Sequence, residues 1–188
     1  MGSIAEPLNP MEVALASGAT FVSRTLDVLQ KDMGEIFYQG AQHKGLAFME
    51  VLQNCVIFNN GAWSDYSDRK KRADNDLFLE AGKPMIFGKN KDKGLVHSSH
   101  GFKVVEIGEE YSEADIAVHD PTSLDNAYLL SQLTYPLPLG IVYQVKRPSF
   151  EQGMWRQVDE AKAQKGDGTL HDLYFNADTW VVGGEKDA

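Results

Sequence analysis

Cysteine is almost absent from this sequence: Cys55 is the only one among 188 residues. A single thiol excludes an internal disulfide framework and is typical of a reducing compartment. No apolar run approaches the length that a membrane-spanning helix needs. The first residues also lack the basic and apolar regions of a signal peptide. We therefore expect a cytoplasmic protein that has no membrane partner.

Positive charge is also scarce. The chain has 18 Lys and Arg against 27 Asp and Glu, a formal net charge of −9. This balance argues against non-specific binding to nucleic acid. The basic run Arg69–Arg72 predicts a solvated surface, with contact to phosphate or an acidic partner as the alternative. The hydrophobic fraction of 43% is ordinary for a globular protein with its own core.

Complete catalytic motifs are missing as well. The sequence has no P-loop, no Gly-x-Ser-x-Gly elbow and no His-Glu-x-x-His. His97 and His100 are three residues apart, but no acidic or thiol ligand nearby completes a tetrahedral metal site. The segment 166–169 does not follow an apolar strand, so it predicts a turn rather than a diphosphate loop. His119 and Asp120 could form an acid–base pair, or Asp120 could cap a helix.

The first sixty residues predict a strand–helix–strand unit. A short helix begins at Pro10 with Asn9 as its cap, and a strand follows over 19–23. Helical spacing of apolar residues predicts a helix over 26–43, and the apolar run 46–52 predicts a strand covered on both faces. Ligands gather beyond the carboxyl ends of strands in such α/β sheets. Cys55 comes directly after the second strand and is therefore a candidate ligand or nucleophile.

Two interpretations of Cys55 stay open on these residues alone. A free cysteine is commonly a small buried core residue. Alternatively, Cys55 is a ligand whose partners lie outside this chain, since one thiolate cannot hold an iron–sulfur cluster.

After residue 60 the pattern predicts a mixture of short strands and helices. The expected strands are 85–88, 94–97, 102–107 and 140–145, and the expected helices are 124–133 and 149–165. The tail 166–188 carries more apolar surface than a disordered tail would. We expect this tail to dock on this chain or on a neighbour through Leu170, Leu173, Tyr174, Phe175 and Trp180.

Several segments, in order along nearly the whole chain, resemble the β subunit of 2-oxoacid:ferredoxin oxidoreductases, of the 2-oxoglutarate or pyruvate type. They are 10–24, 43–59, 83–88, 118–120, 138–143, 170–173 and 178–180, of which 43–59 is the most specific. The chain resembles the C-terminal half of that subunit only. The resemblance implies an α/β fold in which residues 1–60 are the C-terminal part of a doubly wound, thiamine-diphosphate-binding domain. Residues 61–188 would then form a mixed α+β C-terminal extension.

In the family, the β subunit binds thiamine diphosphate with Mg²⁺ and holds a [4Fe–4S] cluster on four cysteines. The resemblance places the fourth of these cysteines at Cys55. The other three, and the Gly-Asp-Gly-Asp motif that grips the metal and the diphosphate, belong to the N-terminal half and do not occur here. We therefore expect Cys55 to be a cluster ligand, with Asn59 as a loop-shaping neighbour, and we assign no catalytic residue to this chain. The chain alone is expected to bind neither cofactor stably.

The implied reaction is the oxidative decarboxylation of a 2-oxoacid to acyl-CoA, with electrons passing through the cluster to ferredoxin. The tail 178–180 favours 2-oxoglutarate. The implied partners are the α subunit, the missing N-terminal half of the β subunit, ferredoxin and coenzyme A, and the isolated chain is expected to be inactive. Two alternatives are a non-catalytic α/β module that docks on an α subunit or a second copy, and a stand-alone enzyme with Cys55 in its core.

Overall fold

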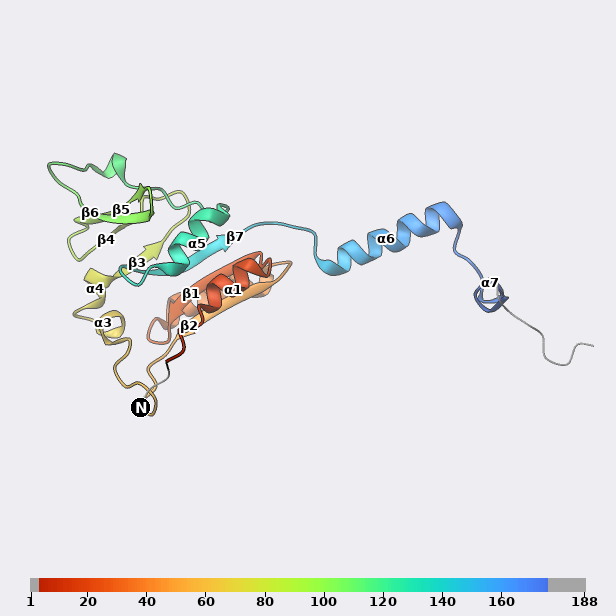
Figure 1. Cartoon of the computed structure of the whole chain (residues 1–188), viewed down its shortest axis with the longest axis horizontal. Helices are drawn as coiled ribbons and strands as arrows, with labels where there is room; N and C mark the ends of the chain where they lie inside the picture. The colour runs from red at the N-terminus through yellow and green to blue at the C-terminus, as the bar shows by residue number, and fades with distance from the viewer. Residues whose placement is uncertain (1–3, 176–188) are drawn as a thin grey trace, which may run out of the picture. The chain divides into compact units, whose positions relative to one another are not determined.

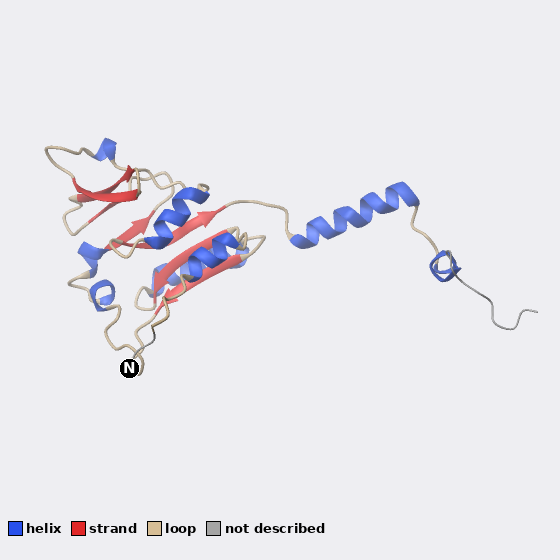
Figure 2. Cartoon of the chain, in the orientation of Figure 1, coloured by secondary structure: helices blue, strands red, loops and turns tan. Residues whose placement is uncertain are grey.

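The computed structural model describes residues 4–175, and it divides the chain into two compact units, 1–147 and 148–188. The first unit contains a four-stranded sheet and a three-stranded sheet (Figures 1 and 2). Its helices are α1 (Pro10–Ala16), α2 (Gln30–Gln42), α3 (Ser64–Ser67), α4 (Arg72–Asn75) and α5 (Leu124–Gln132), with a 3₁₀ turn, η1 (Glu113–Asp115). The predicted α/β class is therefore confirmed.

The four-stranded sheet has the order β2-β1-β7-β3. Its strands are β1 (Phe21–Leu26), β2 (Ala47–Leu52), β3 (Asp76–Leu79) and β7 (Leu137–Gln144). β1 and β2 are parallel, as the βαβ pattern predicts, whereas β7 runs antiparallel to β1 and parallel to β3. Consequently the carboxyl ends of β1 and β2 and the amino ends of β7 and β3 share one end of the sheet. We call it the Cys55 end, defined by Leu26, Leu52, Asp76 and Leu137.

Helices pack on both faces of this sheet. α1 contacts α5, and Met11 and Leu15 of α1 join Val22 of β1 in the main core. α2 lies against β1 and β2, where Gly40 approaches the sheet closely. A Cβ at Gly40 would lie 2.7 Å from the sulfur of Met49. The helix therefore sits on the strands at a distance that only glycine permits without movement of Met49.

β1 begins and ends later than the sequence predicts. It runs to Leu26, three residues beyond the predicted strand, and α2 accordingly begins at Gln30 instead of residue 26. All six residues of β1 are buried, including Arg24. Arg24 is tolerated there because its Nε lies 2.5 Å from a carboxylate oxygen of Glu50, its register partner on β2. A charged residue thus continues the strand because the neighbouring strand neutralises it.

The three-stranded sheet is antiparallel, in the order β4-β5-β6. It consists of β4 (Ile86–Phe87), β5 (Lys93–Ser98) and β6 (Gly101–Glu106), close to the predicted strands. Phe87, Leu95 and Met85 belong to the same core cluster as Val22 of the larger sheet. The two sheets of the first unit therefore share one core.

The second unit contains α6 (Phe150–Lys165) and α7 (Leu170–Phe175). α6 begins with a capping box, in which Ser149 and Gln152 each accept a hydrogen bond from the backbone N–H of the other. Its start and end agree with the prediction. The tail residues Leu170, Leu173, Tyr174 and Phe175 are exposed, and Trp180 and the segment 178–180 lie outside the described residues. Among the described helices, none is long and apolar enough to cross a membrane.

Candidate functional site

Cys55 lies in the loop that follows β2, at the Cys55 end of the sheet. Its side chain is exposed and forms no disulfide. The interpretation of Cys55 as a buried core residue is therefore wrong. The thiol is accessible at the end of the sheet where the βαβ pattern predicts ligands.

The loop folds back on itself around the thiol. Cys55 and Asn59 form an isolated antiparallel bridge, and the amide of Asn59 donates to the carbonyl of Cys55 at 3.0 Å. Asn54 closes the loop from outside, because its side-chain carbonyl accepts from the amide of Gly61 at 2.7 Å and its NH₂ group donates to Asn60 at 3.0 Å. The predicted role of Asn59 in shaping the loop is consistent with this bridge.

Backbone amides around Cys55 favour its thiolate form. The pKa of the Cys55 thiol is lowered, chiefly by hydrogen bonding from the amide of Phe58 and further by the amides of Ile57 and Asn59. Amides aimed at a sulfur stabilise negative charge on it. They are also among the features that set the potential of a cluster bound by such a sulfur. The loop therefore suits a thiolate that binds a metal centre.

The three residues after Cys55 are strongly exposed despite being apolar. Val56 is 71% exposed, Ile57 83% and Phe58 90%. A contiguous apolar surface of this kind marks a contact with another molecule or segment more often than a free surface. The exposed thiol and this apolar tripeptide lie on the same loop, so whatever covers the tripeptide also approaches the sulfur.

A small apolar cluster anchors both ends of the loop. Leu26, Leu29, Leu137 and Leu139 form its buried part. Leu52, which precedes the loop, and Trp63 and Tyr66, which follow it, pack against that part. The residues before and after the loop therefore pack on the same cluster. This packing holds the loop at the Cys55 end of the sheet.

The other predicted candidates are not brought together. His97 lies near the end of β5 opposite Phe102 of β6, and their ring centroids are 4.9 Å apart. Among the residues described, no group of three His, Cys, Asp or Glu side chains could hold a metal ion. The basic run is exposed at residues 69–71, as predicted, and Lys71 pairs with Asp65 at 2.8 Å.

His119 and Asp120 do not form an acid–base pair. His119 is buried, its Nε2 lies 2.8 Å from the carbonyl oxygen of Ile141, and burial lowers the pKa of its imidazole. Asp120 instead accepts from the amide and hydroxyl of Thr122. The cap of α5 is Ser123 and not Asp120. Residues 166–169 connect α6 to α7, with Gly166 as the C-cap of α6 and a bend at Asp167.

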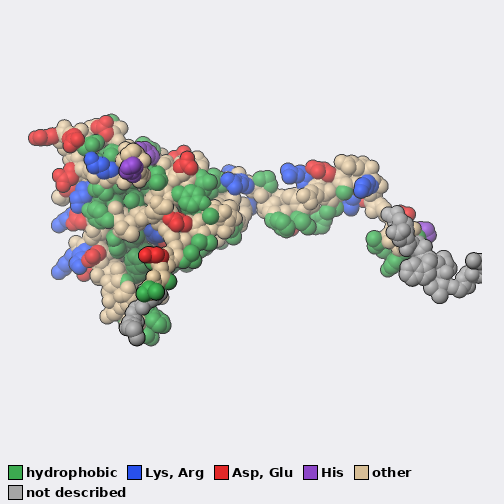
Figure 3. Space-filling view, viewed as in Figure 1, with side chains coloured by type: hydrophobic (Ala, Val, Ile, Leu, Met, Phe, Trp, Pro, Cys, Tyr) green, Lys and Arg blue, Asp and Glu red, His purple; other side chains and the backbone are tan. Residues whose placement is uncertain are grey.

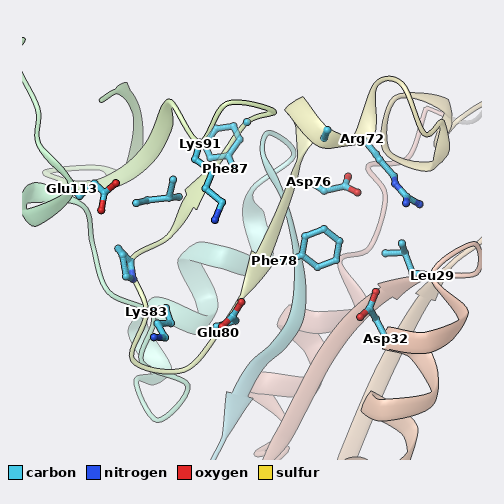
Figure 4. Close-up of a pocket in the computed structure, with 14 residues that line it drawn as sticks. Leu29, Asp32, Arg72, Asp76, Phe78, Glu80, Lys83, Phe87, Lys91 and Glu113 are labelled. Carbon is cyan, nitrogen blue, oxygen red and sulfur yellow. The ribbon is translucent and has the colours of Figure 1, made fainter. Parts of the chain in front are cut away.

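The structure also reveals a site that the sequence analysis missed. Asp76 is 4% exposed, both of its carboxylate oxygens lack a hydrogen-bond partner, and burial raises the pKa of this carboxyl to about 7. It lines a pocket of about 700 Å³ beside β3 (Figure 4). No motif surrounds Asp76 in the sequence, so only its burial identifies it.

Cys55 is expected to react faster with iodoacetamide in the folded chain than in the chain unfolded in urea, at a pH below the ordinary thiol pKa. The reason is the larger thiolate fraction, since the thiolate is the nucleophile. The pH dependence of alkylation, followed by mass spectrometry, measures the thiol pKa. Phe58→Pro, which removes the most effective amide, should raise that pKa, whereas Phe58→Ala retains the amide and should not. Equal thiol pKa values in the two variants would contradict the role of this amide.

Two known proteins are similar in sequence to this chain. No family model matches it. The 2-oxoglutarate oxidoreductase subunit KorB of Mycobacterium tuberculosis is 35% identical over 191 residues, covering 97% of this chain and 50% of that subunit. The 2-oxoacid:ferredoxin oxidoreductase subunit beta of Saccharolobus solfataricus is 31% identical over 134 residues, covering 66% of this chain and 44% of that subunit. The chain thus spans about half the length of the curated relatives it matches.

A solved structure supports the same placement at the level of the fold. A 2-oxoglutarate:ferredoxin oxidoreductase from Magnetococcus marinus, with 2-oxoglutarate, coenzyme A and succinyl-CoA bound, matches with a TM-score of 0.59 and 19% identity. The match covers 95% of this chain and 47% of that one. The chain therefore belongs to the family of 2-oxoacid:ferredoxin oxidoreductase β subunits, of which it represents about half.

Proposed function

We propose that this chain is the C-terminal part of the β subunit of a 2-oxoacid:ferredoxin oxidoreductase. The assembled enzyme oxidatively decarboxylates a 2-oxoacid, with 2-oxoglutarate preferred over pyruvate, to the acyl-CoA and passes the electrons to ferredoxin. The preference is supported by the names of two similar proteins, the mycobacterial subunit and the Magnetococcus enzyme, which both specify 2-oxoglutarate. We place the assembled enzyme in the cytoplasm.

Within that enzyme, Cys55 is one of the four ligands of a [4Fe–4S] cluster. The observation that carries this role is an exposed thiol whose pKa is lowered by the surrounding backbone amides. Thiolate is the form that binds iron in such clusters. When bound, a cluster of this kind accepts and passes on electrons one at a time. Because Cys55 is the only cysteine in the chain, the other three ligands must come from another polypeptide segment.

The described residues do not fit the other implied cofactor. Thiamine diphosphate is held through Mg²⁺, a hard cation that prefers carboxylate and other oxygen ligands. The Gly-Asp-Gly-Asp motif that grips the metal and the diphosphate in the family does not occur in this sequence. The contribution of this chain to the enzyme is therefore assigned to the cluster and to assembly. Thiamine diphosphate and Mg²⁺ are assigned to the part of the β subunit that the present sequence does not span.

Assembly with other subunits is favoured by an apolar stripe on α6 (Figure 3). Phe150, Met154, Trp155 and Val158 follow helical spacing, and Phe150 and Trp155 are 85% and 61% exposed. Apolar residues at this spacing form one face of a helix, which a folded protein normally covers. The stripe also favours the second candidate function, a non-catalytic module that docks on an α subunit or on a second copy.

The test is the activity of the assembled complex. This chain is combined anaerobically with the remaining half of the β subunit and the α subunit, and coenzyme-A-dependent reduction of ferredoxin is measured with each 2-oxoacid. We expect kcat/KM for 2-oxoglutarate to exceed that for pyruvate by about 10- to 100-fold, which corresponds to one charge-assisted hydrogen bond to the additional carboxylate. A complex that contains its cofactors but oxidises no 2-oxoacid would leave only the docking module.

A further inference from the structure

Asp76 lies at the start of β3 and is buried without a partner. Its side chain is among the most thoroughly buried polar groups of the first unit, yet neither oxygen is hydrogen-bonded. Burial of a carboxylate is costly unless a positive charge or hydrogen-bond donors compensate it. Arg72 is near enough to lower the pKa of Asp76 partly, but no ion pair joins the two among the described residues. Both oxygens of such a buried carboxylate can still accept hydrogen bonds from a donor.

A pocket lies beside Asp76. Both carboxylate oxygens are covered in this structure, so a donor in the pocket reaches them only after the Asp76 side chain turns towards it. Figure 4 shows Asp76, Phe78 and Leu29 on one side of the pocket and Lys83 and Glu113 on the other. Phe78 is 49% exposed, so part of this residue is accessible to a guest. An exposed ring attracts a cation, and an arginine-type guanidinium in particular stacks on it. Leu29 also lines the pocket and is 7% exposed, so it offers a small apolar contact to an aliphatic stem.

The charges around the pocket also favour a cationic guest. Four carboxyl groups line it against three basic side chains. The carboxyls are Asp32, Asp76, Glu80 and Glu113, and the basic groups are Arg72, Lys83 and Lys91. A guanidinium offers several N–H donors in a planar fork that matches both oxygens of one carboxylate.

We propose that Asp76, Phe78 and Leu29 form a binding site for a guanidinium group on an aliphatic stem. The carboxylate accepts two N–H donors, the ring of Phe78 covers the guanidinium plane, and Leu29 contacts the stem. The same chemistry has two sources, a free small guanidine and an arginine side chain of another polypeptide that contacts this face.

The test uses agmatine as the probe and the full 188-residue chain. Agmatine is titrated into ¹³C-aspartate-labelled chain at pH 8, and the carboxyl resonance of Asp76 is followed by NMR. We expect a saturable shift, and a pKa of Asp76 that falls by at least one unit when agmatine is saturating. That fall corresponds to binding at least ten times weaker at pH 5, where Asp76 is protonated. Butylurea, a neutral analogue, should cause no such shift.

Two variants complete the design, and binding to them is followed through the amide resonances. Asp76→Asn should weaken agmatine binding at least tenfold. Asp74→Asn is the matched control, because Asp74 lies outside the pocket and accepts from the amide of Lys89 at 3.0 Å, which an asparagine oxygen can also do. Equal binding to wild type and Asp76→Asn would overturn the proposal. An Asp76 pKa below 4 without agmatine would also overturn it, because it would show that Arg72 already pairs with the carboxylate.

Repeating the agmatine titration on the assembled complex distinguishes a free guanidine from an arginine side chain as the ligand. Retained agmatine binding would support a free guanidine as the ligand. Binding to the chain that is lost in the complex would support an arginine side chain from a neighbouring segment. The measurement on the chain alone does not depend on oxidoreductase activity, so failure of the proposed enzyme function would leave this site standing.

Discussion

Replacing Cys55 with serine is expected to remove or convert the [4Fe–4S] cluster that we propose for the assembled enzyme. The variant retains the loop but loses the sulfur towards which the loop directs its amides. Changes to groups that only support a ligand already cost about 10- to 100-fold in metal affinity or activity. Loss of the ligand itself should therefore lower 2-oxoacid-dependent ferredoxin reduction by at least about 100-fold. Iron content per complex and the electron paramagnetic resonance signal of the reduced cluster measure the effect directly.

Val56→Ala is the matched control for that experiment. It alters the neighbouring residue, which is also exposed, but leaves the thiol and the backbone amides in place. We expect its iron content to equal that of the wild type. If Cys55→Ser showed the same iron content and the same spectrum as this control, Cys55 would not be a cluster ligand, whatever happened to activity.

Removing the carboxylate of Glu50 is expected to destabilise the first unit strongly. Arg24 is buried on β1, and its ion-pair partner Glu50 lies opposite on β2. Glu50→Ala therefore leaves the buried guanidinium with no compensating charge. Breaking a buried pair from one side typically costs about 3–5 kcal/mol in the free energy of unfolding. Urea denaturation of the full chain, followed by circular dichroism, measures the loss. A cost below about 1 kcal/mol would show that the pair behaves as an exposed one.

Two further variants separate charge burial from other effects. Glu35→Ala on α2 is the surface control, because Glu35 is exposed and bonds only Gln39, and surface changes of this kind stay within about 0.5 kcal/mol. The double variant Arg24→Met with Glu50→Leu removes both charges and should recover most of the stability. Recovery of this kind would identify the unpaired charge, and not lost packing, as the cause.

The sequence predicts helices and strands correctly where contacts between neighbouring residues determine them. Asn9 caps α1 with Pro10 as the first helical residue, because both features act within one turn of chain. The bounds of α6 are predictable for the same reason, since Ser149 and Gln152 form a local capping box. β2 is recognisable as a mostly apolar run that contains one charged residue, Glu50, and its parallel pairing with β1 follows from the helix between them. The predicted covering of β2 on both faces is wrong, because β2 is an edge strand whose six residues are all only partly buried.

Prediction was less accurate where one segment depends on another that is distant in sequence. The extension of β1 through Arg24 to Leu26 requires Glu50, 26 residues away, and nothing in the segment itself reveals this partner. The insertion of β7 between β1 and β3 is likewise a matter of long-range pairing. The unpaired state of Asp76 is a property of its surroundings, which no sequence pattern specifies.

By itself, the sequence determined the α/β class, the helix caps, the single thiol after β2 and, through its resemblance, the family. These features depend on neighbouring residues or on residue identity, which the chain carries directly. Only the tertiary structure decided that Cys55 is exposed and that Asp76 is buried with no hydrogen-bond partner on either carboxylate oxygen. Burial and hydrogen bonding are set by the whole packed unit, and a residue's neighbours in sequence do not determine which groups surround it in space.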